Sequence, residues 1–315
     1  MKKILITGSL GQIGSELTLK LRKYYGVDKI ISTDIRNIEN DITTNGIFEV
    51  LDVLDSNKLY ELCKKYNVDT VIHLAALLSA TGEKNPILTW NINMGSLINC
   101  LDVCKELNLK LFVPSSIAVF GNDTPKNFTP QSTIMRPSTM YGVTKVSGEL
   151  LCDYYFNKFG VDTRGLRFPG LISYVTKPGG GTTDYAVDIY YKAIEDKKYN
   201  CYLREDSYMD MMYMPDALNS IINLMESDGS KLIHRNSYNI SAMSFSPKDI
   251  YLEIKKHIKD FEIIYEIDPV RQSIAESWPN SIDSSCAENE WGFKFEYNLK
   301  NMTEDMLSRL GFQKI

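Results

Sequence analysis

Short apolar runs alternate with longer amphipathic stretches from Lys3 to Phe168 of this 315-residue chain, and no other feature restricts the fold as much. Strand-like runs followed in turn by helix-like runs predict a parallel sheet with helices on both faces. The sequence therefore predicts an α/β fold with a Rossmann-type, doubly wound parallel sheet. The expected strands are Lys3–Thr7, Lys29–Thr33, Phe48–Val53, Thr70–Leu74, Lys110–Pro114 and Asp162–Phe168, and the expected helices are Ser15–Tyr24, Lys58–Tyr66, Pro86–Leu107 and Thr139–Lys158.

The alternation weakens after Phe168. The strand candidates there are shorter, and the segment Pro178–Gly181 contains a proline and three glycines. We expect residues 1–168 to form a nucleotide-binding domain, with some later segments returning to it, and residues 169–315 to form mainly a smaller, mixed α/β lobe that binds the substrate. No charged or Pro/Ser-rich linker separates the two parts, which favours a lobe built from insertions. Its strand candidates are Asn200–Leu203, Met211–Tyr213, Tyr238–Ile240 and Glu262–Ile264.

The composition excludes several classes of function. Hydrophobic residues make up 43% of the chain, and a net charge of −5 without a basic stripe argues against nucleic-acid binding. No apolar run approaches the roughly 18 residues of a membrane span, and the first apolar run is too short for a signal peptide. We therefore expect a cytoplasmic protein that acts on a small molecule and has no nucleic-acid or membrane partner.

The six cysteines are scattered, and five of them fall within apolar runs, where a cysteine behaves as a small hydrophobic residue. The chain has only three histidines. Neither a histidine nor a second cysteine pair stands at the spacing of a zinc site. The sequence therefore predicts no metal site. No disulfide is expected in the cytosol.

Three glycines follow the first expected strand in the pattern Gly8-x-x-Gly11-x-x-Gly14. Between a strand and a helix, the first two allow a tight turn and close backbone approach to a pyrophosphate, and the third lets the helix pack against the strand. Gln12 and Ile13, at the start of that helix, belong to the same predicted dinucleotide site. The pattern alone would be weak, and its place after a strand supports it.

Asp34 lies at the end of the second expected strand, 20 residues after Gly14. A carboxylate there accepts hydrogen bonds from the ribose hydroxyls and repels a 2′-phosphate, which favours NAD over NADP. Alternatively, Asp34 caps a turn, and Arg36 could assist an NADP phosphate. Because ligands bind at the carboxyl edge of a parallel sheet, further cofactor contacts are predicted near other strand ends, at Asp52, Val53, Leu74, Ala75, Ala76 and Phe168.

Tyr141 and Lys145 are four residues apart in an expected helix, and Ser116 follows a strand-like run 25 residues before the tyrosine. Positions i and i+4 share a helix face, so the Lys145 ammonium is expected to lower the tyrosine pKa from about 10 toward neutrality. Tyr141 would then act as a general base while Ser116 bonds the substrate oxygen. Tyr-x-x-x-Lys also occurs by chance on helix surfaces, but the glycine turn and the serine argue against chance here.

Together these residues resemble the extended short-chain dehydrogenase/reductase superfamily over the whole chain. Several strings are similar to the short-chain-type L-threonine 3-dehydrogenases. This resemblance implies NAD-dependent oxidation of L-threonine at C3 to 2-amino-3-oxobutyrate, without zinc. It also implies that Lys145 holds the nicotinamide ribose. It further implies a homodimer, formed through the helices expected at residues 86–107 and 139–158. The strings are Leu77–Glu83, Pro114–Phe120, Arg167–Gly170, Pro178–Ala186, Met211–Asp216 and Ser277–Asp283.

L-threonine carries a carboxylate and an ammonium group besides its hydroxyl. Backbone N–H groups of the glycine turn, with the hydroxyls of the two threonines that follow, can bind a carboxylate; the alternative is a mobile loop without ligand contact. The resemblance adds Ser79 and Trp278 to the pocket, although Trp278 could equally be a buried anchor of the lobe. The predicted substrate residues are Ser79, Ser116, Tyr141, Gly181, Thr182, Thr183 and Trp278.

Two alternative functions remain open. Nucleotide-sugar 4-epimerases and dehydratases of the same superfamily commonly carry an asparagine where this chain has Pro169-Gly170, and an arginine where it has Met209. Without this asparagine and this arginine, a diphosphate would lose charge-assisted hydrogen bonds worth about 1.5–3 kcal/mol each. Their absence therefore favours a small substrate. The second alternative is an NAD-binding regulatory protein without turnover, against which the intact Ser116, Tyr141 and Lys145 argue.

Overall fold

The computed structural model describes residues 1–175 and 181–312, with the backbone only for residues 80 and 81. Its centre is a seven-stranded sheet in the order β10-β6-β5-β4-β1-β2-β3, and every neighbouring pair in it is parallel. The predicted Rossmann-type α/β class is confirmed. The strands are β1 (Ile4–Thr7), β2 (Ile30–Asp34), β3 (Ile47–Val50), β4 (Thr70–His73), β5 (Lys110–Ser116), β6 (Thr163–Phe168) and β10 (Tyr238–Asn239).

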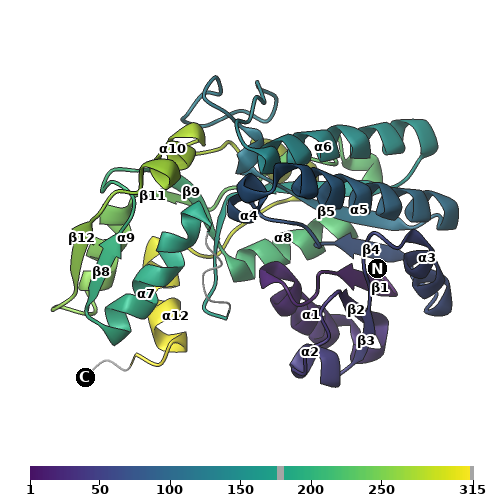
Figure 1. Cartoon of the computed structure of the whole chain (residues 1–315), viewed down its shortest axis with the longest axis horizontal. Coiled ribbons are helices and arrows are strands. Elements are labelled where there is room, and N and C mark those ends of the chain that lie inside the picture. Colours follow the sequence, from purple (N-terminus) through teal and green to yellow (C-terminus); the bar gives the residue numbers. More distant parts are fainter. Residues whose placement is uncertain (176–180, 313–315) are drawn as a thin grey trace.

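Helices cover both faces of this sheet because successive residues of a buried strand point to opposite sides. Ile4 and Ile6 pack with α1 (Gln12–Tyr25) and α8 (Met214–Glu226) on one face. Leu5 between them packs on the other face, where α5 and α6 lie side by side (Figure 1). The helices on that face are α3 (Ser56–Lys65), α5 (Pro86–Leu107) and α6 (Met140–Phe159).

Strands β3 and β4 end earlier than the sequence predicts. β3 ends at Val50, so Asp52 and Val53 lie in the turn that follows, where the Asp52 carboxylate accepts the Leu54 N–H at 2.9 Å. An aspartate side chain that accepts a hydrogen bond from the backbone N–H two residues later stabilises a turn, so the strand does not continue here. β4 likewise ends at His73, so Leu74 follows the strand.

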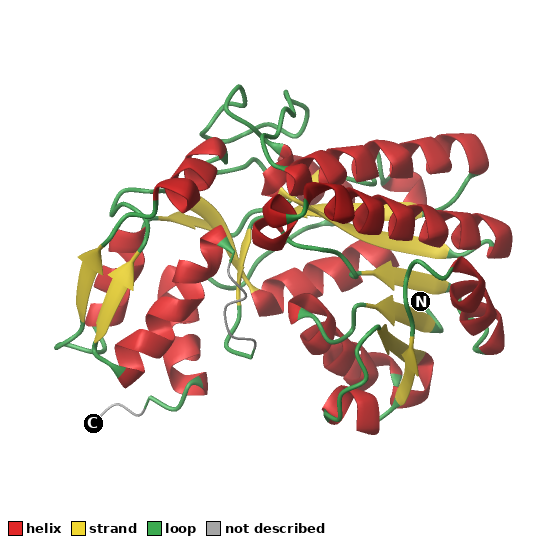
Figure 2. Ribbon diagram, in the orientation of Figure 1, coloured by secondary structure: helices red, strands yellow, loops and turns green. Residues whose placement is uncertain are grey.

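The smaller lobe lies beside the central sheet, on the left in Figures 1 and 2, and includes the last helix of the chain. A three-stranded sheet β11-β9-β7 and a two-stranded sheet β12-β8 form its strands. Its elements are β7 (Gly170–Ile172), η3 (Thr182–Asp184), α7 (Tyr185–Glu195), β8 (Lys198–Cys201), β9 (Met209–Tyr213), β11 (Met243–Phe245), α9 (Pro247–Lys255), β12 (Glu262–Tyr265), α10 (Pro269–Ser277) and α12 (Leu299–Arg309).

One strand expected in the lobe belongs to the central sheet. Tyr238 pairs with Leu166 and Asn239 with Arg167, so β10 extends the central sheet beyond β6. A two-residue strand carries no signal for its partner, and here the fully buried side chains of Tyr238 and Ile240 pack with the α8 face of the sheet. In the described parts of the chain, none of the helices combines the length and the apolar character that crossing a bilayer requires.

Candidate active site

The turn between β1 and α1 requires glycine at two of its positions. Gly8 has φ +67°, and a Cβ added there would lie 2.8 Å from the Ala75 nitrogen. A Cβ on Gly14 would lie 2.2 Å from the Gly8 carbonyl oxygen, so the third glycine permits the helix to pack against the turn. α1 begins with Gln12 and Ile13, and its N-cap residue Gly11 has no side chain that could accept bonds from the first-turn N–H groups. These N–H groups can therefore bind an anion.

Asp34 is bound to the same turn. Its carboxylate accepts the Leu10 N–H at 3.0 Å, and the Arg36 N–H and Nε at 3.1 and 3.0 Å. Burial alone would raise the pKa of Asp34, but the hydrogen bonds from Arg36 and Leu10 outweigh it and hold this pKa below its usual value. The side chain of Arg36 is 53% exposed, whereas that of Asp34 is 5% exposed. A buried, ionised carboxylate thus stands beside the predicted dinucleotide site.

The end of β4 contains a polar residue that the sequence analysis missed. The N–H groups of Leu74 and Ala75 donate to the Thr7 hydroxyl at 3.2 and 3.3 Å, and this hydroxyl lies 2.8 Å from His73 Nδ1. Burial, together with the positive charge of Lys145, lowers the pKa of His73 to about 3, so the ring is neutral. These contacts position Leu74 and Ala75 against Gly8, while Ala76 follows them half-buried. The sequence signal that could have identified His73 is a histidine at the end of a buried strand.

Ser116, Tyr141 and Lys145 come together at the carboxyl end of β5. The hydroxyl of Thr139 accepts the Gly142 N–H at 3.1 Å and so caps the start of α6 beside Tyr141. Ser116 ends β5, and its hydroxyl lowers the pKa of the Tyr141 phenol, so the two groups lie close to each other. Lys145 Nζ lies 5.4 Å from the centroid of the Tyr141 ring and donates to the Pro114 carbonyl at 2.6 Å. The predicted serine, tyrosine and lysine therefore share one site.

The predicted effect of Lys145 on the tyrosine pKa is wrong for this arrangement. Burial raises the pKa of Tyr141 to about 12, although the hydrogen bond with Ser116 lowers it. Burial also lowers the pKa of Lys145 to about 8, against the raising effect of Glu149. Helix spacing predicted that the two side chains meet. It carried no information on their burial or on the Pro114 carbonyl that accepts a hydrogen bond from the Lys145 ammonium. At neutral pH the pair is a phenol and an ammonium group.

A cavity of about 40 Å³ lies beside Lys145, and its lining is mainly apolar but includes His73, Asn93 and Glu149. This volume holds one or a few water molecules. Glu149 forms an ion pair with Arg167 at 2.8 Å, and both side chains are 4% exposed. The sequence analysis missed this pair because burial of opposite charges from different elements leaves no local pattern.

The predicted substrate residues lie on several elements. Ser79 begins α4 (Ser79–Lys84), which packs against α6, and Glu83 of α4 accepts the Met140 N–H at 2.7 Å. Trp278 is 7% exposed and belongs to the same apolar cluster against which Tyr141 packs. This burial agrees with the alternative interpretation of Trp278 as an anchor of the lobe.

The glycine-rich segment is described from Gly181 onward, and Pro178, Gly179 and Gly180 lie outside the described residues. Thr182, buried, and Thr183, half-buried, open η3, which contacts β7 and α10. The Tyr202 hydroxyl donates to the carbonyls of Gly181 and Thr182 at 3.3 and 3.2 Å, which fixes the start of η3.

The remaining predicted cofactor residues differ in burial. Val53 is half-buried and packs against the core on the α5 face, whereas Asp52 is exposed. Phe168 is in register with Ser116 on the neighbouring strand and is buried among the residues of the α8 face.

Comparisons with known proteins identify the family of the chain. The family model "NAD dependent epimerase/dehydratase family" matches residues 4–241. An L-threonine dehydrogenase from Clostridium difficile is 65% identical, with a TM-score of 0.97 over 98% of each chain. The GalE-like L-threonine dehydrogenase from Cupriavidus necator, in its holo form, is 48% identical, with a TM-score of 0.95 over 98% of this chain and 99% of that one.

An uncharacterized epimerase/dehydratase from Staphylococcus saprophyticus is 58% identical over 311 residues, which are 98% of this chain and 97% of that relative. The family match covers most of the chain, from β1 to β10. The site described above lies within the matched residues, except for Trp278. The chain therefore belongs to the NAD-dependent epimerase/dehydratase family, and its structural neighbours include L-threonine dehydrogenases.

Proposed function

We propose that this protein is an L-threonine 3-dehydrogenase that uses NAD to oxidise L-threonine at C3 to 2-amino-3-oxobutyrate. One observation carries the proposal. Ser116, Tyr141 and Lys145 meet beside a glycine turn in a chain that is 65% identical, over 98% of its length, to an L-threonine dehydrogenase.

The residues present fit NAD. The turn at Gly8 and Gly14 and the first N–H groups of α1 suit a pyrophosphate, and the ionised carboxylate of Asp34 suits ribose hydroxyls. Bound NAD would supply the hydride acceptor, and the positive charge of its nicotinamide ring would favour the phenolate form of a nearby tyrosine. Asp34 would disfavour the additional phosphate of NADP.

The protein residues would move one proton. The Tyr141 phenolate oxygen takes the proton from the C3 hydroxyl, while the C3 hydrogen leaves with two electrons as hydride, and C3 becomes a carbonyl carbon. Ser116, whose hydroxyl lies near the Tyr141 phenol, would hold the substrate oxygen beside it. The Lys145 ammonium, 5.4 Å from the centroid of the Tyr141 ring, would hold the nicotinamide ribose.

Packing near the substrate residues favours a small substrate over a nucleotide sugar. A Cβ on Gly170 would lie 2.3 Å from the Met211 sulfur and 2.8 Å from Thr183 Cγ2, so this position has no room for a polar side chain. Met209 is fully buried in the lobe core and offers no charge to a diphosphate. The anchors that a sugar nucleotide would need are therefore replaced by apolar packing.

A substrate panel tests the proposal. Purified protein, treated with a chelator, should reduce NAD with L-threonine and much more slowly with L-serine. It should not interconvert UDP-glucose and UDP-galactose. Epimerase turnover without a response to L-threonine would favour the nucleotide-sugar alternative, and NAD binding without turnover of any substrate would favour the regulatory one.

The pH dependence should report the two ionisable groups of the site. The pKa of Tyr141 is raised to about 12 and that of Lys145 lowered to about 8. Because the pKa of Tyr141 is raised, its phenolate form is scarce at neutral pH, and the population of this form grows as the pH rises. The ammonium charge of Lys145 is present below about pH 8 and is lost above it. We therefore expect kcat/KM for L-threonine to rise from about pH 6 and to level off above about pH 8. A flat or falling profile in that range would contradict this assignment.

Replacing Asp34 with serine should shift the cofactor preference toward NADP. The change removes the carboxylate and releases Arg36, whose Nε lies 3.0 Å from it, to bind a phosphate. The ratio of kcat/KM for NAD to that for NADP should fall by roughly 10- to 150-fold, as loss of a charge-assisted bond implies. The control is Asp123→Ser, which removes an exposed carboxylate that faces Arg136 at 3.5 Å and should leave the ratio unchanged. A wild-type preference for NADP would refute the cofactor assignment.

We also propose a homodimer formed through α5 and α6, which expose large apolar side chains. The substitution Leu150→Glu places a charge on α6 at a side chain that is 59% exposed, and should convert the dimer to monomers in light scattering. Leu19→Glu, on α1 at 44% exposure, should leave the mass unchanged. A monomeric wild type would refute the assignment. The exposed side chains are Ile87, Leu88, Trp90 and Ile98 of α5 and Val143, Leu150, Tyr154 and Phe159 of α6.

A further inference from the structure

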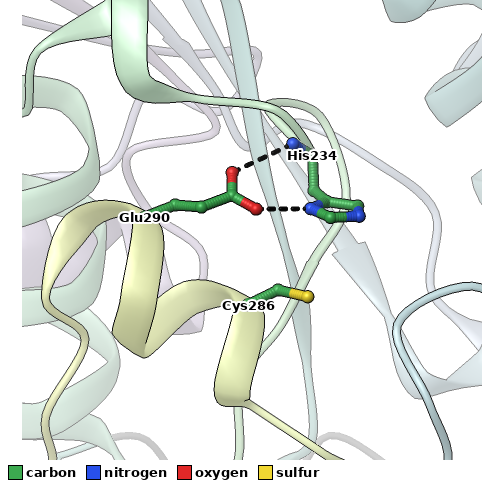
Figure 3. Close-up of side chains that lie close together, drawn as sticks. All are labelled: His234, Cys286 and Glu290. Carbon is green, nitrogen blue, oxygen red and sulfur yellow. Dashed lines mark hydrogen bonds and ion pairs between the residues drawn. The ribbon is translucent and has the colours of Figure 1, made fainter.

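Three potential metal ligands meet at the outer edge of the central sheet, next to β10. His234 lies in the loop before β10, and Cys286 and Glu290 lie four residues apart on α11 (Ser285–Trp291), so they share a helix face. One ligand atom from each residue lies within 4.8 Å of the other two. Figure 3 shows the carboxylate of Glu290 turned toward His234, with the thiol of Cys286 below the imidazole.

The carboxylate of this cluster is held firmly. Glu290 Oε2 accepts the N–H groups of Ile233 and His234 at 2.7 and 3.2 Å and the hydroxyl of Tyr238. Its Oε1 lies 2.6 Å from His234 Nδ1. The loop and the helix are therefore positioned without help from an ion.

The cluster is open to solvent on one side. The side chain of His234 is 29% exposed and that of Glu290 is 10% exposed, while Cys286 is half-buried. A small ion can therefore enter, and one coordination position is left for water. A nitrogen, a sulfur and an oxygen donor with an open fourth position form a ligand set that zinc accepts and that magnesium or calcium does not favour.

We propose that His234, Cys286 and Glu290 bind one zinc-class divalent ion, with water as the fourth ligand. The ion would take the place of the proton between His234 Nδ1 and Glu290 Oε1. The thiol proton of Cys286 would pass to the buffer, and the ring proton of His234 would move from Nδ1 to Nε2. One thiolate and one carboxylate would then balance the two positive charges of the ion.

Small side-chain movements are sufficient for this geometry. Bonds of about 2.0–2.3 Å to a tetrahedral ion place the ligand atoms roughly 3.3–3.7 Å apart. His234 Nδ1 and Glu290 Oε1, now 2.6 Å apart, would separate by roughly 0.7 Å, and the sulfur would move inward. Glu290 can keep its bonds from Ile233 and Tyr238 because those use its other oxygen.

The proposed site is separate from the proposed reaction. His234 and Cys286 belong to a loop and a helix that pack on β10, whereas Ser116 and Tyr141 belong to β5 and α6. A bound ion would connect α11 to the loop before β10. It should raise the melting temperature, and turnover of L-threonine should not depend on it.

Cobalt provides a direct readout of the thiolate ligand. Protein freed of metal and kept reduced with a phosphine should bind one Co²⁺ per chain with a near-ultraviolet cobalt–thiolate band, and Zn²⁺ should displace it. Cys286→Ser should lose the band, and both Cys286→Ser and His234→Asn should lose Zn²⁺ affinity by about 10-fold or more against a chromophoric chelator. His257→Asn, a histidine outside the cluster, should retain both.

Cys286→Ser exchanges a single atom, so its circular dichroism and melting temperature without metal should match the wild type and separate loss of a ligand from loss of the fold. The proposal is overturned if the wild type binds no stoichiometric Co²⁺ or Zn²⁺. It is also overturned if the band survives in Cys286→Ser, or if His234→Asn and His257→Asn bind Zn²⁺ equally. Because these readouts need no turnover, their failure is distinct from failure of the dehydrogenase proposal.

Discussion

Replacing Tyr141 with phenylalanine is expected to lower kcat for L-threonine oxidation by about 10²–10⁴-fold while leaving NAD binding largely unchanged. The substitution removes the hydroxyl beside Ser116 but keeps the ring against the apolar cluster of the lobe. Without that oxygen, the proton of the substrate hydroxyl has no acceptor in the site. Stopped-flow or steady-state NADH absorbance measures kcat, and fluorescence quenching measures NAD affinity.

The matched control for this substitution is Tyr155→Phe on the same helix. Its hydroxyl donates to Asp102 at 3.0 Å, away from Ser116, so its loss should leave kcat within a few-fold of the wild type. Near-normal kcat in Tyr141→Phe would refute the assignment of Tyr141 as the base. An equal loss in both variants would point to disruption of α6 in place of loss of a proton acceptor.

Replacing Gly14 with alanine is expected to destabilise the protein by about 1–3 kcal/mol and to weaken NAD binding by at least about 10-fold. The added Cβ would lie 2.2 Å from the Gly8 carbonyl oxygen and 2.9 Å from Ser9 Cα, so α1 must move away from the turn. These obstacles are backbone atoms, which cannot turn aside as a flexible side chain can. Thermal unfolding without cofactor measures the stability, and titration calorimetry measures the affinity.

A graded control lies in the same turn. A Cβ on Gly11 would lie 3.2 Å from the Gly8 carbonyl oxygen, a contact that a shift of a few tenths of an ångström relieves. Gly11→Ala should therefore lower the melting temperature less than Gly14→Ala. If Gly14→Ala melts at the wild-type temperature and binds NAD normally, the packing role of this glycine is wrong.

The sequence predicted elements well where local signals mark both ends. Helix α5 spans the predicted Pro86–Leu107 because a proline occupies its first turn and Asn108, with φ 54°, ends it in the left-handed region. β10 was assigned to the wrong part of the molecule because its partner, β6, lies about 70 residues earlier, and periodicity carries no information on such pairing.

The site shows the same division. Residues that act through fixed spacing or through turn geometry were predicted, as Gly8, Gly14 and the Tyr141 and Lys145 pair illustrate. His73 and Glu149 were not, because their role depends on burial, which tertiary packing decides. The raised pKa of Tyr141 was missed for the same reason. His234 and Cys286 are 52 residues apart, so no spacing rule could have brought them together.

The return of α8 and β10 to the central sheet means that the part built around this sheet and the lobe are not separable units. After β6 the chain enters the lobe through β7, returns as α8 and β10, leaves again through β11 and α9, returns as α11, and ends in the lobe with α12. A chain that stopped at residue 168 would expose the edge of β6 and the apolar residues that α8 covers. Because several segments of the chain join the two parts, a single cut in any one connection would leave both parts bound together.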